Sequence, residues 1–302
     1  MKELYLKKIS TIFIFSSLIC FVFIIGINLN TVMATSLLHH WSADGDAKDS
    51  IGSANGMLEG TVTYAPGKVG QSFKFNGNNY DGVNLGDVPD LNFSPDSEYT
   101  ISAWINLAEL VETWSSIILL NYPCKSTEQG LVVDKNRVSF VIRDSYGISV
   151  NVTSANEISK KTWYHIVGVR EVNSTEKLLK LYINGKLAAS AIDKTSGQLA
   201  NSGSDYIGRR YSCPSNNPFN GLIDELSIYD GSLSETEIKD IYSLVPISGC
   251  LKTFGRPLQN GTVLMIQSGE FHQKAKLDKK GCFQLDSLNI DKPYSIIVRK
   301  KE

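Results

Sequence analysis

The sequence is poor in charge, histidine and cysteine for its length. Only 20% of its 302 residues are charged, the formal net charge is −1, and there are four histidines and five cysteines. This balanced charge offers no broadly basic face of the kind that binds nucleic acid. So few histidines and cysteines exclude a metal-cluster protein, and 42% hydrophobic residues exclude a disordered polymer. What remains is a folded chain of one large domain or two ordinary ones.

The amino terminus has the order of a secretory signal peptide over residues 1–34. Lysines at positions 2, 7 and 8 precede an uncharged apolar run over 9–27, and Val32-Met33-Ala34 fits a small-residue cleavage site. The alternative is an uncleaved membrane anchor, because the run approaches the roughly 20 residues that span a bilayer. Either way we expect the rest to be secreted or held at the cell surface. Cleavage removes three lysines and one glutamate, which leaves a net charge of −3 and four cysteines.

Residues 35–245 consist almost entirely of predicted strands and turns. Runs rich in Val, Ile, Tyr, Phe and Thr are bounded by Gly, Asn, Asp, Ser and Pro. Several alternate with a period of two, as in Tyr99–Ile105, and Asn184-Gly185 is a strong hairpin signal. The expected strands include 72–75, 99–105, 115–120, 137–142, 163–170, 178–183 and 222–229. The pattern predicts an all-β protein with an antiparallel jelly-roll sandwich.

One helix closes this sandwich, and a small β-sandwich module follows at residues 246–302. The helix begins at a capping box formed by Ser234 and Glu237, continues through Val245, and ends at Pro246. The second module contains five predicted strands, at 248–251, 262–267, 273–277, 281–285 and 294–298. With about 55 residues it is small for an independent core.

The four cysteines of the exported part predict two disulfides. An even number of cysteines in an oxidising compartment favours pairing, although four cysteines allow three arrangements. The domain boundary favours Cys250–Cys282 within the small module and Cys124–Cys213 between two polar loops of the sandwich. The alternative is that one or more thiols stay free.

Residues 37–243 resemble a laminin-G-like, concanavalin-A-like jelly-roll domain. The resemblance is carried, in order, by segments 38–45, 49–56, 67–77, 99–105, 163–166, 181–185, 206–208 and 219–229. Residues 247–299 resemble a carboxypeptidase-regulatory-like, transthyretin-like module, carried by 247–249, 255–263, 280–283 and 294–298. The first resemblance implies a fold that hosts lectins, adhesion modules and enzymes. The second implies a spacer or display stem.

No catalytic residues are expected, although glycoside hydrolases share the jelly-roll fold. Retaining hydrolysis needs two carboxylates about 5–5.5 Å apart, and the resembling glucanases carry Glu-x-Asp-x-x-Glu. The nearest stretch here has Leu222 and Ser227 in place of the flanking carboxylates, and Asp224 and Glu225 are adjacent. We therefore expect that the protein is not an enzyme. The weakest alternative is a glycoside hydrolase whose catalytic site the sequence does not reveal.

Calcium is the cofactor that the sequence favours. Ca²⁺ takes six to eight oxygen ligands, often from turns, and Asp44 and Asp49 lie in a dense acidic turn. The resemblance implies that this turn packs near the strand of Asp224, so these three residues are the expected metal ligands. The alternative is that the aspartates cap local backbone amides.

Ligand recognition is expected at loops rich in aromatic residues and arginine. One candidate is Trp114, which lies in the polar loop 112–116. The others are Tyr122, Arg209, Arg210 and Tyr211, which lie beside the loops of Cys124 and Cys213. Loops at the ends of sandwiches carry function, and the predicted partner is a carbohydrate or a glycoprotein. The alternatives are that the aromatic residues cover the sandwich edge, and that the protein is a structural adhesion module that binds another protein.

Overall fold

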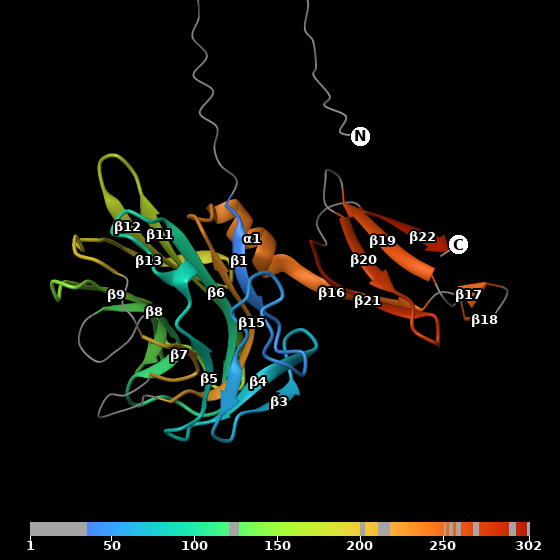
Figure 1. The fold of residues 1–302 in the computed structure, drawn as a ribbon, viewed down its shortest axis with the longest axis horizontal. Helices are drawn as coiled ribbons and strands as arrows, with labels where there is room; N and C mark the ends of the chain where they lie inside the picture. Colours follow the sequence, from blue (N-terminus) through green and yellow to red (C-terminus); the bar gives the residue numbers. More distant parts are fainter. Residues whose placement is uncertain are drawn as a thin grey trace, which may run out of the picture. The chain divides into compact units, whose positions relative to one another are not determined.

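The computed structural model describes residues 35–120, 127–199, 203–210, 218–250, 252–253, 256–257, 261–267, 272–289 and 294–300. Residues 35–302 form one compact unit, and the predicted leader lies outside the described residues. Within the part of the chain described, no helix has the length and apolarity required to cross a membrane. The described residues between 35 and 230 build two antiparallel sheets, which confirms the predicted all-β sandwich (Figure 1).

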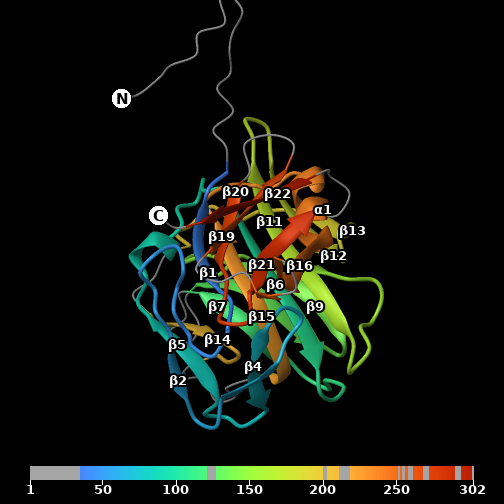
Figure 2. The same ribbon diagram turned by 90° about the vertical axis from the view of Figure 1, so that its right-hand side faces the viewer.

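The first sheet has the strand order β13-β12-β11-β6-β15-β4-β3, and β1 also pairs with β15. Strand β15 pairs with β4 through its first half and with β1 through its second half, and a bulge at Asp224–Ser227 separates the two. Figure 2 shows β15 beside β6 and β4. The strands are β1 Leu37–Trp41, β3 Thr63–Pro66, β4 Gln71–Asn76, β6 Tyr99–Leu107, β11 Trp163–Val172, β12 Lys177–Ile183, β13 Lys186–Ile192 and β15 Asn220–Tyr229.

The second sheet has the order β10-β9-β8-β7-β14-β5-β2. Its strands are β2 Met57–Glu59, β5 Gly82–Gly86, β7 Ser115–Leu120, β8 Glu128–Asp134, β9 Arg137–Arg143, β10 Ser149–Thr153 and β14 Asp205–Ile207. A short 3-10 helix, η1, covers Pro89–Leu91 between β5 and β6. All strand pairs of both sheets are antiparallel.

The core lies between the two sheets and follows the predicted alternation. In β6, Tyr99, Ile101 and Ile105 belong to the buried core cluster. Thr100, Ser102 and Trp104 point to the outer face of the first sheet, because successive side chains of a strand alternate. Burial at roughly 25 cal/mol per Å² of apolar surface is the main force holding the sheets together. The same alternation leaves the outer face free to carry polar groups.

The predicted hairpin and capping box are both confirmed. Asn184 and Gly185 connect β12 to β13 with φ of 51° and 73°, the positive angles that a type I′ turn requires. The helix α1 spans Glu235–Ser243, and the Ser234 amide and hydroxyl both donate to Glu237 Oε2. The helix ends before the predicted Pro246, because the chain enters strand β16 at Leu244. Backbone pairing in this strand replaces the last expected helical turn.

The C-terminal part forms short antiparallel sheets in the described residues. Strand β16 pairs with β21, β17 with β18, and β19 pairs with both β20 and β22. The strands are β16 Leu244–Cys250, β17 Lys252–Thr253, β18 Arg256–Pro257, β19 Gly261–Gln267, β20 His272–Lys276, β21 Cys282–Asn289 and β22 Tyr294–Lys300. The five strands predicted here are all found. The transthyretin-like assignment of this module stays a prediction.

The register of β16 with β21 bears on the predicted disulfides. Cys250 and Cys282 are directly opposite each other in this register, and Cys282 is disulfide-bonded. This placement is the one that the predicted Cys250–Cys282 pair requires, and the pairing itself stays a prediction. Cys124 and Cys213 lie outside the described residues.

Candidate functional site

The aromatic residues predicted to rim a ligand site are described only in part. Trp114 is half-buried in the segment before β7, and it packs against Leu119, Val132 and Val141. These three residues alternate with core residues of β7, β8 and β9, so they lie on the outer face of the second sheet. Tyr122 and Tyr211 lie outside the described residues. Trp114 is therefore the one predicted aromatic ligand residue that the structure places.

The two predicted arginines have structural partners. Arg209 is 5% exposed, its Nη1 donates to the carbonyl oxygen of Tyr80 over 2.8 Å, and its Nη2 pairs with Glu59. Its guanidinium also stacks over the Tyr206 ring, 4.4 Å from the centroid. Arg210 is half-buried, with its Nη2 3.5 Å from a carboxylate oxygen of β8. These contacts hold the Arg209 guanidinium within the protein, and the ligand-binding role of both arginines stays a prediction.

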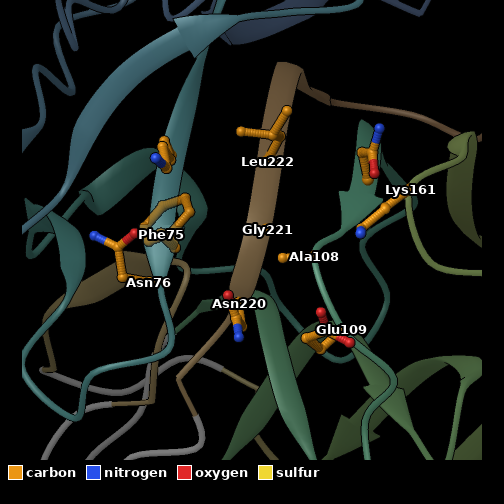
Figure 3. A pocket seen from close by; sticks show the side chains of 10 residues that line it. Phe75, Asn76, Ala108, Glu109, Lys161, Asn220, Gly221 and Leu222 are labelled. Carbon is orange, nitrogen blue, oxygen red and sulfur yellow. The ribbon is translucent and has the colours of Figure 1, made fainter.

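A groove of about 410 Å³ opens on the outer face of the first sheet (Figure 3). It lies where β4 and β6 end and β15 begins. Figure 3 shows Lys161 and Glu109 on one side of β15 and Phe75 and Asn76 on the other. The lining side chains include Lys74, Asn106, Glu109, Lys161, Asn220 and Leu222. No sequence motif joins these positions, so the prediction from sequence missed them.

The groove continues into a second hollow of about 340 Å³ that contains Trp114. Glu109 and Asn220 line both hollows, so the two hollows adjoin at these side chains. We call the two hollows together the groove. Strand alternation could have predicted part of the first hollow. Asn106 lies between the core residues Ile105 and Leu107, so its side chain points to the outer face. Trp114 was found because it is an aromatic residue in a polar segment.

The floor of the groove lacks side chains at Gly221. The φ of Gly221 is 149°, and a Cβ atom placed there would lie 2.2 Å from the carbonyl oxygen of Asn106. Ala108 is next to it, and the Ala108 amide donates to the carbonyl oxygen of Asn220 over 3.0 Å. Only glycine fits so close an approach of two strands. The bare floor leaves room for a ligand between the flanking polar side chains.

Four polar side chains of the groove form no side-chain hydrogen bond in the described part of the protein. They are the amides of Asn106 and Asn220 and the amines of Lys74 and Lys161. By contrast, the amide of Asn76 donates to Thr61. Asn106 and Asn220 are half-buried. Amide groups that face a groove and lack protein partners are free to bind the hydroxyl groups of a ligand.

Glu109 is the single carboxylate among the described residues that line the groove. Its Oε2 accepts a hydrogen bond from Lys160 Nζ over 2.6 Å. This hydrogen bond and the positive charge of Lys160 lower the pKa of Glu109. The carboxylate is therefore ionised at neutral pH and already engaged by a cation.

The first predicted calcium ligand, Asp49, already binds the protein with both of its oxygens. Its Oδ2 accepts from His39 Nδ1 over 2.6 Å and from the Ala54 amide over 3.0 Å. Its Oδ1 accepts from the amides of His40, Ile51 and Gly52. Burial opposes ionisation, and these hydrogen bonds outweigh it and hold the pKa of Asp49 at about 2. The side chain acts as the organiser of an acidic turn.

Asp224 and Asp44 hold a different turn. Asp224 Oδ2 accepts from the amides of Lys68 and Val69 over 2.7 and 3.0 Å, and Asp44 Oδ1 accepts from the Gln71 amide over 2.7 Å. Burial raises the pKa of Asp224 to about 7, although backbone amides favour its ionised form. No three candidate ligands among the described residues gather as a metal site. The structure thus gives all three aspartates backbone amides as partners, and calcium binding stays a prediction.

A known family matches the central part of this fold. Residues 76–239, more than half of the chain, match the family described as the concanavalin A-like lectin/glucanases superfamily. The match covers β5 to α1, and it begins at Asn76 on the groove. No curated protein sequence matches the chain.

Solved structures with the same fold include binding domains. Domain 4 of AbnA, a GH43 extracellular arabinanase from Geobacillus stearothermophilus in complex with arabinotriose, is 25% identical. The match covers 68% of this chain and 98% of that one, with a TM-score of 0.55. The binding domain of Paraclostridial mosquitocidal protein 1 is 20% identical, with 87% and 64% covered and a TM-score of 0.58. The botulinum neurotoxin serotype G binding domain is 16% identical, with 82% and 64% covered and a TM-score of 0.55. This chain spans less than two thirds of those last two.

Proposed function

The chain belongs to the concanavalin A-like lectin/glucanases superfamily, and from this premise we propose that it is an exported, non-catalytic protein that binds carbohydrate in the groove. The observation that carries the proposal is the convergence of unpartnered polar side chains with an aromatic ring. Asn106 and Asn220 present free amides, and Trp114 lines the adjoining hollow. Sugars combine hydroxyl groups with apolar ring faces, which such a surface complements.

The size and shape of the groove favour an oligosaccharide over a single sugar. Hollows of about 410 and 340 Å³ share Glu109 and Asn220 and so adjoin. Each lies in the range of small-molecule sites. The arabinotriose complex of the AbnA domain, which has this fold, supports an oligosaccharide as ligand. The glycan of a glycoprotein would satisfy the same chemistry.

The absence of a second carboxylate supports binding without hydrolysis. Canonical glycoside hydrolysis uses two carboxyl groups on either side of the scissile bond. Among the described residues that line the groove, only Glu109 carries one, and Lys160 engages it. Export is proposed from the leader at residues 1–34, whose basic and apolar order is that of a signal peptide.

Calorimetric titration with a panel of neutral oligosaccharides, arabinotriose included, tests this proposal. We expect at least one to bind, and we expect Trp114→Ala to weaken that affinity about five-fold, since a ring contact contributes about 1 kcal/mol. Tyr146→Ala is the matched control, because Tyr146 is 75% exposed and does not line the groove. Failure of the whole panel to bind, or equal affinities for the two variants, would overturn the proposal.

A further inference from the structure

The groove carries positive charge that carbohydrate binding alone does not require. On the basis of the proposed function, we infer that the groove selects oligosaccharides that bear anionic groups, either carboxylates or sulfates. The inference rests on the amines of Lys74 and Lys161, which both line the same hollow of the groove. Neither amine forms an ion pair with a carboxylate in the described residues.

The local charge balance is opposite in sign to that of the chain. Lys74 and Lys161 each add one positive charge to the lining, and Glu109 is the single negative charge. Lys160 lies next to this carboxylate and neutralises it. The lining therefore holds two lysines against one carboxylate, an excess of one positive charge, in a chain whose formal net charge is −1. Charges of one sign in a depression focus the field and attract ligands of the opposite sign.

The backbone holds Lys161 in a conformation that few side chains adopt. Its φ is 57°, in the left-handed region that disfavours residues other than glycine, asparagine and aspartate. Its amide donates to the carbonyl oxygen of Leu107 over 2.7 Å, which ties this position to the end of β6. Figure 3 shows the Lys161 side chain directed toward the middle of the pocket. Strained positions of this kind concentrate at binding sites.

The lining can bind two kinds of ligand group, hydroxyl groups and anionic groups. The free amides of Asn106 and Asn220 donate to and accept from hydroxyl groups and carry no charge preference. An unpaired ammonium gains more from a carboxylate or sulfate, because charge-assisted hydrogen bonds are about twice as strong as neutral ones. A uronic acid or a sulfated sugar offers both kinds of group within one residue. A neutral oligosaccharide offers neither amine an anionic group.

Affinity measurements with three probes of equal length test the inference: a neutral arabino-oligosaccharide, an oligogalacturonate and a sulfated heparin fragment. We expect one of the two anionic probes to bind at least five-fold more tightly than the neutral probe at low salt, with this advantage lost at 0.5 M NaCl. Lys74→Gln and Lys161→Gln should each lower the anionic affinity, by up to about five-fold for an exposed charge pair. For the neutral probe, each variant should lose less affinity than it loses for the anionic probe.

The control variant is Lys186→Gln, which removes an exposed lysine that lines neither hollow of the groove. It should leave every affinity unchanged, and unchanged melting temperatures should show that the lysine variants are folded. If the neutral probe binds as tightly as both anionic probes, the inference is wrong and the proposed function stands. If no probe binds, the proposed function fails together with the inference. An equal loss in Lys186→Gln would show that only the overall charge matters and would also overturn the inference.

Discussion

At the scale of single residues, Asp49 organises the first turn of the sandwich. Its side chain is fully buried, and it accepts hydrogen bonds from one histidine ring and four backbone amides. A buried carboxylate is tolerated only with such a set of donors. Sequence analysis placed Asp49 in a functional turn, and the structure shows that its partners are the amides of that turn.

Replacement of Asp49 by asparagine should therefore destabilise the protein. Asparagine removes the charge and directs an amide donor at backbone donors, which should cost about 2–4 kcal/mol at pH 7. The folded pKa of about 2 lies below the ordinary 3.8, so the carboxylate's contribution is present above pH 3.8 and is lost as the pH falls through 2. Urea unfolding between pH 2 and 5 should show an acid loss of about 2 kcal/mol that Asp49→Asn lacks. Parallel pH profiles would contradict this role.

His165 is a second buried titratable residue that should make the stability of the fold depend on pH. It is 1% exposed, its Nε2 lies 2.8 Å from the Ser102 hydroxyl, and its Nδ1 has no hydrogen-bond partner in the described structure. The ring lies 5.1 Å from that of Trp104 and 6.0 Å from that of Tyr242, between centroids. Burial lowers the pKa of His165 to about 3. The imidazole is therefore neutral in the folded protein throughout the physiological range.

Acidification should destabilise the fold through this residue. The unfolded ring takes up a proton near pH 6.5, whereas the folded ring does so only near pH 3. The stability that the neutral ring contributes is thus present above pH 6.5 and is lost as the pH falls toward 3. Between pH 6.5 and 4.5 the loss should be about 2–3 kcal/mol. Guanidinium unfolding should show a smaller loss for His165→Gln, and an equal loss would refute the assignment.

At the scale of elements, α1 shows how a local signal produces a local structure. The Glu237 amide donates to the Ser234 hydroxyl over 3.3 Å, and the Ser234 amide donates to the Glu237 carboxylate over 2.8 Å. Ile238 then packs with Val167, Tyr182 and neighbouring residues in a small cluster on the first sheet. A nine-residue helix is marginal alone. Its stability depends on the cap and on this packing.

Ser234→Ala should lower the free energy of unfolding by about 1 kcal/mol. The change leaves the helical amide of Glu237 without its side-chain acceptor, and losses of this size are typical of N-cap residues. Thermal unfolding measures the effect, and Ser243→Ala at the exposed end of the same helix is the control. A Ser234→Ala variant as stable as the wild type would mean that packing alone holds α1.

The strands could be predicted because the sequence patterns that indicate them extend over only a few neighbouring residues. Strand β7 has the predicted bounds, and β6 extends two residues beyond the predicted Ile105, because an alternating pattern reports on neighbours along one strand. Sequence patterns did not show the bulge in β15. There Glu225 has a φ of 49°, and the register shifts between Asp224 and Ser227. The bulge depends on pairing with two different strands, which no local pattern encodes.

At the scale of the whole molecule, the groove is a product of topology. It joins the end of β4, the end of β6 and the start of β15, three strands that are adjacent in the sheet and distant in sequence. The register places Asn220 opposite Asn76 and Leu222 opposite Asn106. The sequence predicted the sandwich but not this assembly, since pairing between distant segments decides it, and the ligand-binding role of Trp114 stays a prediction. The pairing of Arg209 with Glu59 could not be predicted for the same reason, because the two residues are 150 positions apart.

A crystal structure of the protein with the tightest-binding oligosaccharide tests the central claim most directly. We expect sugar density along the groove, with hydroxyl groups within 3.2 Å of the Asn106 and Asn220 amides, roughly the limit for such hydrogen bonds. A sugar ring should lie against Trp114. Density for the sugar at any other surface, with the groove empty in the same crystal, would contradict the account.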